Sequence, residues 1–392
     1  MKYDAIVVGI GYAGAVCARR IAEEAGKKVL LIDKRNHIAG NMYDEYDEKG
    51  ILVHRYGPHI SVMNEDRVYK FLSRFTAWHP YLHRVNALID GIEVPLPINF
   101  TSIDLLFSYE KASEIKSALS KQYGEGSSVA ILDMKQSDNA LIRDFADFVF
   151  EKVFLHYTEK MWGLTPEQID PAVTARIPIR LSYDNRHFQH KYQVMPDRGF
   201  TKLFEKMLDH PNIDVRLNTN AKAILCFNED AHTIELKEDG LFSGKVIYSG
   251  ALDELFDYRF GELPYRSLQF EFNSYPQDYI QDSTVLNWPD KRSATRRTEM
   301  KRLTGQRMNG WTSTITEYPG PYQRGSAVFG EPLYPINNSE CLSKYEQYKE
   351  LADEYSQIIL VGRLADYKYY NMESTIKRAL EVCDRLMSSG NT

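Results

Sequence analysis

The fold is decided by a stretch near the start of the chain, which reads Tyr3-Asp-Ala-Ile-Val-Val-Gly9-Ile-Gly11-Tyr-Ala-Gly14. Residues 5–8 are apolar and mostly β-branched, which predicts a strand buried on both faces. Gly9 permits a tight turn, Gly11 lets a pyrophosphate approach the backbone, and Gly14 lets the next helix pack closely. The N–H groups at the start of that helix would point toward the phosphates. The stretch therefore predicts a Rossmann-type dinucleotide site, in preference to an ordinary tight turn.

The elements that follow the turn favour FAD over NAD. A second apolar strand over residues 29–32 ends in Asp33, whose carboxylate can accept hydrogen bonds from an adenosine ribose. Near the other end of the chain, residues 357–361 and 373–388 again read as a strand and then a helix. Such a late unit can close the far end of a long cofactor, whereas NAD usually needs only the first ~150 residues.

The bulk composition excludes several classes of protein. The chain has 392 residues, which allows two or three domains, and its 43% hydrophobic and 26% charged residues are ordinary for a soluble enzyme. A net charge of −6 argues against a nucleic-acid partner. We expect neither a signal peptide nor a membrane span, because no apolar run approaches ~20 residues. Four scattered cysteines indicate free thiols in the cytoplasm, with no disulfide or metal framework.

Hydrophobic periodicity predicts an α/β fold: a Rossmann-like FAD-binding domain with an inserted helical domain and an antiparallel β-sheet substrate domain. We expect a helix over 66–78, a hairpin that turns at Asp90-Gly91, and a strand over 222–226. The proline-broken connector at 165–192 reads as a mobile lid. The predicted boundaries are 1–75, 193–260 and 341–392 for the FAD-binding domain, 76–100 for a sheet segment, 101–192 for the helical domain and 261–340 for the antiparallel sheet domain.

Groups that could carry out chemistry are few. The sequence shows no nucleophile elbow, no paired carboxylates in an acid/base arrangement and no metal motif, so the reactive atom of an enzyme would belong to its cofactor. The chain does offer scattered arginines and tyrosines that could bind a diphosphate, because guanidinium groups bind phosphate oxygens bidentately; they are Arg176, Arg296, Arg297, Tyr334, Tyr369 and Tyr370. A solvated basic face at 291–302 and simple packing of the tyrosines are the alternatives, and spacing alone leaves them open.

Longer motifs carry a resemblance to a known family. On these motifs, which span nearly the whole chain, the sequence resembles the flavin-dependent UDP-galactopyranose mutases. The motifs are Gly9-x-Gly11-x-x-Gly14, Lys34-Arg-Asn-His-Ile-x-Gly40-Asn41, Tyr56-Gly57-x-His59-Ile60, Tyr157-Thr-Glu-Lys-x-Trp162-Gly163, Arg176-Ile-Pro-x-Arg180, Phe256-Asp-Tyr-Arg-Phe-Gly261, Tyr265-Arg-Ser-Leu268, Glu331-Pro-x-Tyr334-Pro335 and Gly362-Arg-Leu-Ala-x-Tyr-Lys-Tyr-Tyr370.

The resemblance implies an isomerase that interconverts UDP-galactopyranose and UDP-galactofuranose, or a close analogue, in cell-surface polysaccharide biosynthesis. Reduced FAD would be the active cofactor: its N5 attacks the anomeric carbon and expels UDP, and the covalent adduct opens and recloses before UDP returns. The implied partner is a UDP-sugar, and the chain could be a monomer or a homodimer.

The same resemblance implies roles for individual residues. Arg176 and Arg296 would be catalytic, because they would offset the charge that develops on departing UDP. The cofactor contacts that it implies are Gly9, Gly11, Tyr12, Gly14, Asp33, Lys34, Asn41, His59, Ile60, Arg363, Tyr370, Asn371 and Met372. The substrate contacts that it implies are His83, Tyr157, Thr158, Trp162, His187, Asn287, Tyr334 and Tyr369.

Five positions depart from the family pattern. Val62 replaces a histidine beside the flavin, Pro58 a small residue, His83 an asparagine, His187 a tyrosine and Asn371 an aspartate. These departures leave the sugar open among galactose, a 2-acetamido sugar and another hexose. Hydrolysis of a nucleotide sugar, a conventional FAD oxidase or dehydrogenase, and a non-catalytic nucleotide-sugar binder also stay open as alternatives.

Overall fold

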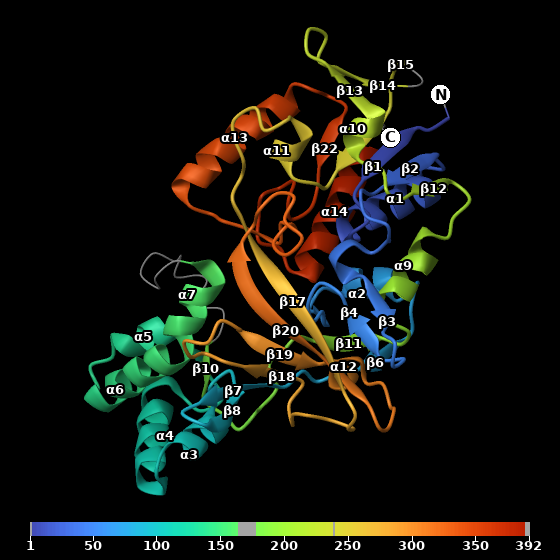
Figure 1. The fold of residues 1–392 in the computed structure, drawn as a ribbon. Coiled ribbons are helices and arrows are strands. Elements are labelled where there is room, and N and C mark those ends of the chain that lie inside the picture. Colours follow the sequence, from blue (N-terminus) through green and yellow to red (C-terminus); the bar gives the residue numbers. More distant parts are fainter. Residues whose placement is uncertain (1, 164–177, 238–239, 389–392) are drawn as a thin grey trace.

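The computed structural model describes residues 2–163, 178–237 and 240–388. Figure 1 shows a parallel sheet with its helices at the end that holds both termini, a long antiparallel sheet through the middle, and a group of helices at the far end. No helix in the described ranges is long and apolar enough to cross a membrane.

The parallel sheet is assembled from distant parts of the chain. Its strand order is β12-β2-β1-β16-β22, and every pair is parallel. Alternate residues of β1 pack into two different cores, which is why its four positions are all buried and apolar. The five strands are β1 (Ala5–Val8), β2 (Val29–Ile32), β12 (Ile213–Arg216), β16 (Lys245–Tyr248) and β22 (Ile358–Leu360).

Helices cover both faces of this sheet. One core lies under α1 (Tyr12–Glu24), α9 (Phe200–Leu208) and α14 (Met372–Ser388), and the other lies under α11 (Leu252–Leu255) and α13 (Ser339–Asp353). Next to the sheet lie α10 (Ala221–Ile224) and the small antiparallel sheet of β13 (Leu225–Asn228), β14 (Thr233–Leu236) and β15 (Gly240–Leu241). The strand predicted over 222–226 is therefore wrong in its first half, because Asn220 accepts a hydrogen bond from the Lys222 N–H and caps a helical turn.

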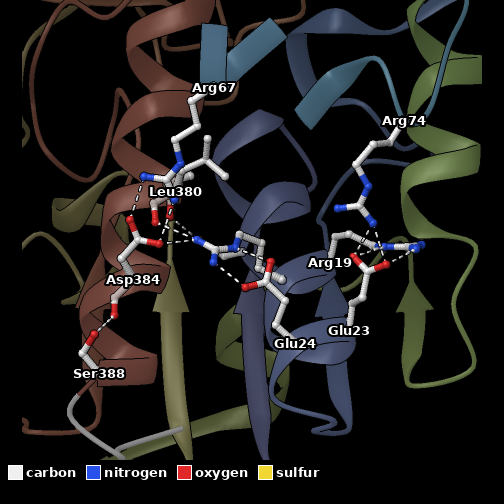
Figure 2. Close-up of polar contacts among 11 residues, drawn as sticks. Arg19, Glu23, Glu24, Arg67, Arg74, Leu380, Asp384 and Ser388 are labelled. Atoms are coloured by element: carbon white, nitrogen blue, oxygen red, sulfur yellow. Dashed lines mark hydrogen bonds and ion pairs between the residues drawn. The ribbon is translucent and has the colours of Figure 1, made fainter. Parts of the chain in front are cut away.

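Ion pairs fasten the helices of the parallel-sheet unit to one another (Figure 2). Asp384 on α14 accepts hydrogen bonds from Arg20 on α1 and from Arg67 on α2 (Asp66–Leu72), each at 2.7 Å. Nearby, Arg19 and Arg74 both bind Glu23. The first and last helices of the unit are thereby held side by side.

The helix α2 is shorter than predicted. It ends at Leu72, and β6 (Trp78–Pro80) follows it as a strand that pairs with β11 (Tyr192–Pro196). Strand pairing with a distant segment, together with a proline that removes a backbone donor, overrides the helical periodicity there. The remaining short elements of this region are η1 (Gly40–Met42), β3 (Asp44–Tyr46), β4 (Leu52–His54) and β5 (Ser61–Met63).

The central sheet has the order β21-β17-β20-β19-β18-β7-β8 and is antiparallel except for the β18–β7 pair. Its two long strands, β17 (Tyr265–Tyr275) and β20 (Thr312–Pro321), run between the other two parts of the molecule (Figure 1). The predicted turn at Asp90-Gly91 is confirmed, and both residues have a positive φ. The other members are β7 (Val85–Ile89), β8 (Ile92–Leu96), β18 (Val285–Asn287), β19 (Arg296–Glu299) and β21 (Tyr334–Pro335), with α12 (Met300–Thr304) beside them.

The helical part packs around a third core, which includes Ile103, Ile115 and Phe145. Its last helix, α7 (His156–Trp162), follows a π-helical segment, η2 (Phe150–Leu155), that shifts the register of the preceding helix. The other elements are α3 (Phe100–Leu106), α4 (Tyr109–Tyr123), α5 (Ile131–Lys135), α6 (Ala140–Val149) and the short pair β9 (Ser128–Val129) and β10 (Ile179–Arg180).

Candidate active site

The glycine-rich turn after β1 forms an open cradle. Gly9 has a φ of +96°, and a Cβ there would lie 2.2 Å from Ser249 Oγ. A Cβ on Gly14 would lie 1.9 Å from the carbonyl oxygen of Gly9, so both positions require glycine. At Gly11 the backbone is extended, and a Cβ would meet no atom within 4 Å. The open space above Gly11 is therefore available to a ligand.

This space belongs to a cavity of about 210 Å³ at the carboxyl ends of β1, β2, β16 and β22, where ligands bind in sheets of this type. Segments near residues 33–42, 219–222, 248–251, 331–333 and 362–364 form its walls. The predicted cofactor residues that line it are Gly9, Gly11, Tyr12, Asp33, Lys34, Asn41, Arg363 and Met372.

Polar side chains at the edge of the cavity are held in place. The two oxygens of Asp33 accept hydrogen bonds from the N–H groups of Ile10 (2.8 Å) and Arg35 (2.9 Å). Arg35 also donates to Asn41 (3.0 Å) and pairs with Glu331. The open cradle and the fixed acid at the end of β2 fit a dinucleotide.

The other predicted cofactor residues lie outside the lining of this cavity. Gly14 is used for packing between α1 and the turn. Asn371 caps α14, because its side-chain oxygen accepts a hydrogen bond from the Ser374 N–H at 2.7 Å. Ile60 packs against the core under α1, and the Tyr370 hydroxyl group interacts with Asp366.

Two histidines, the buried His54 and the half-buried His59, leave ring nitrogens without a partner among the described residues. His54 Nδ1 accepts a hydrogen bond from the His59 N–H at 3.1 Å, while His54 Nε2 and His59 Nδ1 are buried and unpartnered. Burial lowers the pKa of both rings, and the positive charges of Arg363 and Arg296 lower that of His59 further. The buried Tyr12 hydroxyl also has no partner in the part of the chain that the structure describes, and such atoms usually find a partner when a site is filled.

Arg296 and Glu317 form a buried ion pair in the central sheet. Arg296 Nε donates to Glu317 Oε1 at 2.8 Å, and the Glu317 side chain is fully buried. Burial opposes the charge of Arg296, but Glu317 and neighbouring tyrosines outweigh it and raise the pKa of the guanidinium. This is the one hydrogen bond that the Arg296 side chain makes within the described ranges, so its terminal nitrogens are available to an anion.

Tyrosines surround this arginine. The rings of Tyr334 and Tyr369 stack with centroids 5.6 Å apart, and the Arg363 guanidinium carbon lies 5.4 Å and 5.7 Å from them. Burial raises the pKa of Tyr157 and of Tyr334, while the charge of Arg296 acts in the opposite direction on both. The phenol groups therefore stay protonated and can donate hydrogen bonds.

The predicted nucleotide contacts come from α7 and β18. Tyr157 and the buried Thr158 lie on α7, while Asn287 lies directly opposite Arg296 in the β18–β19 pair and leaves its buried Oδ1 unpartnered within the described ranges. The structure thus brings Asn287 and Tyr157 close to Arg296. The side chain of Trp162 and the whole of Arg176 lie outside the described residues, together with residues 165–177 of the predicted lid.

His83 and His187 form a neutral pair at the side of this cluster. Their rings meet edge to face with centroids 5.7 Å apart. His83 Nδ1 lies 3.1 Å from the Tyr81 hydroxyl, and His187 Nδ1 lies 3.1 Å from the Leu96 carbonyl oxygen. Burial lowers the pKa of His187 to about 4 and holds that of His83 well below its usual range, and Arg296 adds to both effects.

Sequence reasoning missed two residues of this site. Glu317 was not singled out, although one acid in the middle of a long strand is a signal worth testing. His54 gave no such signal. The basic run at 291–302 is no uniform solvated face: Lys301 is buried, Arg297 binds Gln281, and Arg296 turns toward the tyrosines.

Comparisons with known proteins agree with this geometry. Residues 152–369 match the family described as UDP-galactopyranose mutase, and residues 7–75 match an NAD(P)-binding Rossmann-like domain. The chain is 35% identical over 390 residues to a UDP-galactopyranose mutase of Mycoplasma pneumoniae, covering 98% of this chain and 96% of the relative. It is 34% identical over 399 residues to a dTDP-fucopyranose mutase of Escherichia coli, covering 98% of each.

Solved structures share the fold. A crystal structure of reduced UDP-galactopyranose mutase superimposes with a TM-score of 0.70 at 15% identity, covering 99% of this chain and 94% of the other. A putrescine oxidase variant superimposes with a TM-score of 0.62 at 10% identity, covering 99% of each chain. The predicted fold class, a Rossmann-like unit with added helices and an antiparallel sheet, is confirmed.

Proposed function

Because the chain belongs to the UDP-galactopyranose mutase family, we propose that it interconverts the pyranose and furanose forms of a nucleoside-diphosphate sugar with FAD as its cofactor. The observation that carries the proposal is that Arg363 borders both the cavity and the group of tyrosines beside Arg296. This residue lines the cavity above Gly11, and its guanidinium also lies over Tyr334 and Tyr369 beside Arg296. The dinucleotide cavity and the anion-binding cluster are therefore neighbours.

The residues at the cavity fit the two ends of FAD. The cradle at Gly11 and the start of α1 would hold the pyrophosphate, and Asp33 would hold the adenosine ribose. The unpartnered nitrogens of His54 and His59 would face the flavin end. When bound and reduced, FAD supplies the nucleophile, its N5 atom, which none of the side chains singled out in the sequence could supply.

Arg296 has the chemistry to stabilise a departing nucleoside diphosphate. Its terminal nitrogens can bind two phosphate oxygens, and the hydroxyl groups of Tyr157 and Tyr334 can donate further hydrogen bonds. Negative charge on the diphosphate grows as the glycosidic bond breaks, so these contacts are stronger in the transition state than in the bound substrate. Arg176 is proposed, by resemblance, to act with Arg296.

A second nucleotide sugar is an equal candidate. The chain is as similar to a dTDP-fucopyranose mutase as to a UDP-galactopyranose mutase, with 34% and 35% identity. The rings at the sugar side, His83 and His187, are uncharged at neutral pH because burial lowers the pKa of each. Such a pair suits a neutral hexose and does not separate galactose from its 6-deoxy relative.

The experiment compares reduced and oxidised holoenzyme. The protein, reduced with dithionite, is incubated with UDP-galactofuranose or dTDP-fucofuranose, and the products are separated by anion-exchange chromatography. We expect conversion to the pyranose form only after reduction. Equal turnover by oxidised enzyme, or a purified protein that cannot take up FAD, would contradict the proposal. Release of free nucleotide and sugar would indicate hydrolysis, and oxygen consumption with amines would indicate an oxidase.

The assembly and location of the protein stay predictions. Light scattering after size-exclusion chromatography distinguishes the monomer from the homodimer. Fractionation of the producing cells tests the cytoplasmic location.

A further inference from the structure

Lys160 lies on α7 and reaches across to the central sheet. Its half-buried side chain directs Nζ at two carbonyl oxygens, that of Trp288 at 2.6 Å and that of Ala294 at 2.9 Å. Both oxygens belong to the segment that joins β18 to β19. Trp288 directly follows Asn287, and Ala294 lies two residues before Arg296. One ammonium group thus holds both ends of the turn that carries these two predicted substrate contacts.

The same helix turn is held from its other side by Arg266 on β17. Arg266 Nε donates to the Met161 carbonyl oxygen at 2.7 Å, and its Nη2 donates to that of Lys160 at 2.8 Å. The N–H of Gly163 donates to the Glu159 carbonyl oxygen at 2.8 Å. Three carbonyl groups at the end of α7, those of Glu159, Lys160 and Met161, therefore have fixed donors.

These contacts fix the end of a helical run that is irregular in its middle. The elements α6, η2 and α7 follow one another without a break from Ala140 to Trp162, and α7 is the last seven residues of this run. The π-helical segment η2 precedes it, so its direction is not dictated by a regular continuation of α6. Tertiary contacts therefore contribute to the orientation of Tyr157 and Thr158, and Lys160 supplies two of them.

We propose that Lys160 is a positioning residue for the nucleotide of the substrate, because it couples the helix with Tyr157 and Thr158 to the turn that orients Asn287 and Arg296. The inference rests on the proposed function, since it takes these four residues to contact the nucleoside diphosphate. Lys160 itself is not taken to contact the nucleotide, because its ammonium group donates hydrogen bonds to the Trp288 and Ala294 carbonyl oxygens.

The charge of this lysine is sensitive to pH. Burial lowers the pKa of Lys160 to about 8, Arg292 acts in the same direction, and Asp290 acts against them. Asp290 and Arg292 bind each other in the β18–β19 turn at 2.9 Å. On α7 itself, His156 and Glu159 pair with each other, and Arg266 of β17 binds the backbone carbonyl group of Lys160. Above about pH 8 the amine becomes neutral, and its two hydrogen bonds lose the assistance of the charge.

The test uses three variants of the FAD holoenzyme. Lys160→Met keeps the length of the side chain and removes its donors, and Lys160→Arg keeps a charge that does not titrate. Lys152→Met is the matched control, because Lys152 lies in the adjacent η2 segment and pairs with the exposed Asp90. The affinity for UDP or dTDP, whichever binds the wild type more tightly, is measured by calorimetry from about pH 7 to about pH 9, with kcat and KM alongside.

We expect Lys160→Met to bind the nucleotide ~10- to 100-fold more weakly and to lose a similar factor in kcat/KM, because displacement of the contact groups by about 1 Å is costly. Its FAD content should match the wild type, and Lys152→Met should behave as the wild type in every respect. The nucleotide affinity of the wild type should fall above about pH 8. Lys160→Arg should bind the nucleotide at neutral pH more tightly than Lys160→Met does, and its affinity should not fall above about pH 8.

Two results would overturn the inference. One is a folded Lys160→Met variant that binds the nucleotide as the wild type does. The other is a Lys160→Arg variant that keeps the wild-type loss of affinity at alkaline pH, and this readout decides the matter even where Lys160→Met does not fold. A wild-type holoenzyme that binds neither UDP nor dTDP overturns the proposed function together with this inference. If the wild type turns over its substrate and the Lys160 variants bind the nucleotide as the wild type does, this inference alone is overturned.

Discussion

Replacement of Gly11 by alanine should weaken the binding of the cofactor and leave the fold intact. A Cβ at this position would meet no protein atom within 4 Å, and the extended backbone of Gly11, with φ at −81°, is ordinary for alanine. The new methyl group would therefore project into the open space above the turn. In the proposed complex that space holds the pyrophosphate of FAD, which approaches the backbone N–H groups directly.

The size of the effect follows from the bonds that the methyl group would break. A hydrogen bond to a charged group contributes about 1.5–3 kcal/mol. Loss of one such bond between the turn and the pyrophosphate weakens FAD binding by roughly 10- to 150-fold. Folding should change little, because Gly11 is the N-cap of α1, and alanine there costs at most about 1 kcal/mol through weaker capping.

Gly14→Ala is the matched comparison, since it adds the same methyl group three residues later. Its Cβ would lie 1.9 Å from the Gly9 carbonyl oxygen and 3.1 Å from Val7 Cγ1. Relief of this contact requires α1 to move away from the turn, and overpacking of this kind costs ~1–3 kcal/mol or more. This variant should unfold at a lower temperature than the wild type even without cofactor.

Two measurements separate the variants: flavin absorbance after titration with FAD, and thermal unfolding of the cofactor-free protein by circular dichroism. Gly11→Ala should bind FAD roughly 10- to 150-fold more weakly than the wild type, with little change in unfolding temperature. Gly14→Ala should unfold at a lower temperature than the wild type. The reasoning is refuted if Gly11→Ala binds FAD with wild-type affinity. It is refuted equally by a Gly11→Ala variant that unfolds as early as Gly14→Ala.

Two further predictions concern single side chains. Arg296→Ala should lower kcat/KM by a factor of roughly 30 to several thousand, because a charged contact of this kind is worth ~2–5 kcal/mol, while FAD stays bound. The control is Arg292→Ala, which loses a pairing with the half-buried Asp290 and should stay near the wild type in the same steady-state assay. Hydrogen bonds from Arg67 and Arg20 lower the pKa of Asp384 to about 2, so the stability that this carboxylate adds is present above pH 4 and is lost as the pH falls toward 2. Asp384→Asn should make thermal unfolding less dependent on pH in that window, and an unchanged dependence would exclude the contribution.

The dinucleotide part of the fold was predictable because its constraints are local. Gly9 needs a positive φ and Gly14 needs the absence of a Cβ, and both needs are met within one turn of the chain. The Asp90-Gly91 turn is local for the same reason. The end of α2 was not predictable, because β6 pairs with a strand more than a hundred residues later along the chain.

The residues of the candidate site were predictable only where they belong to a recognisable sequence motif. Arg296 stands in a basic run, and nothing in that run distinguishes it from Arg297 or Arg292. What distinguishes it is Glu317, a buried carboxylate on the neighbouring strand β20, and this pairing depends on sheet register. His54 is equally invisible, because its unpartnered nitrogen has meaning only once burial is known.

The departures from the family pattern fall where the fold tolerates them. Asn371 caps α14 through a side-chain oxygen, a bond that an aspartate makes as well, so this change alters the charge and keeps the helix start. His83 and His187 are anchored through Nδ1 to Tyr81 and to the Leu96 carbonyl group, and none of these contacts is part of a sheet ladder or a helix end. The nucleotide side differs, because Lys160 holds backbone carbonyl groups that set the turn before Arg296. The same fold can therefore keep its diphosphate contacts while the rings that face the sugar change. We expect differences in substrate specificity between relatives to depend on the positions of His83 and His187.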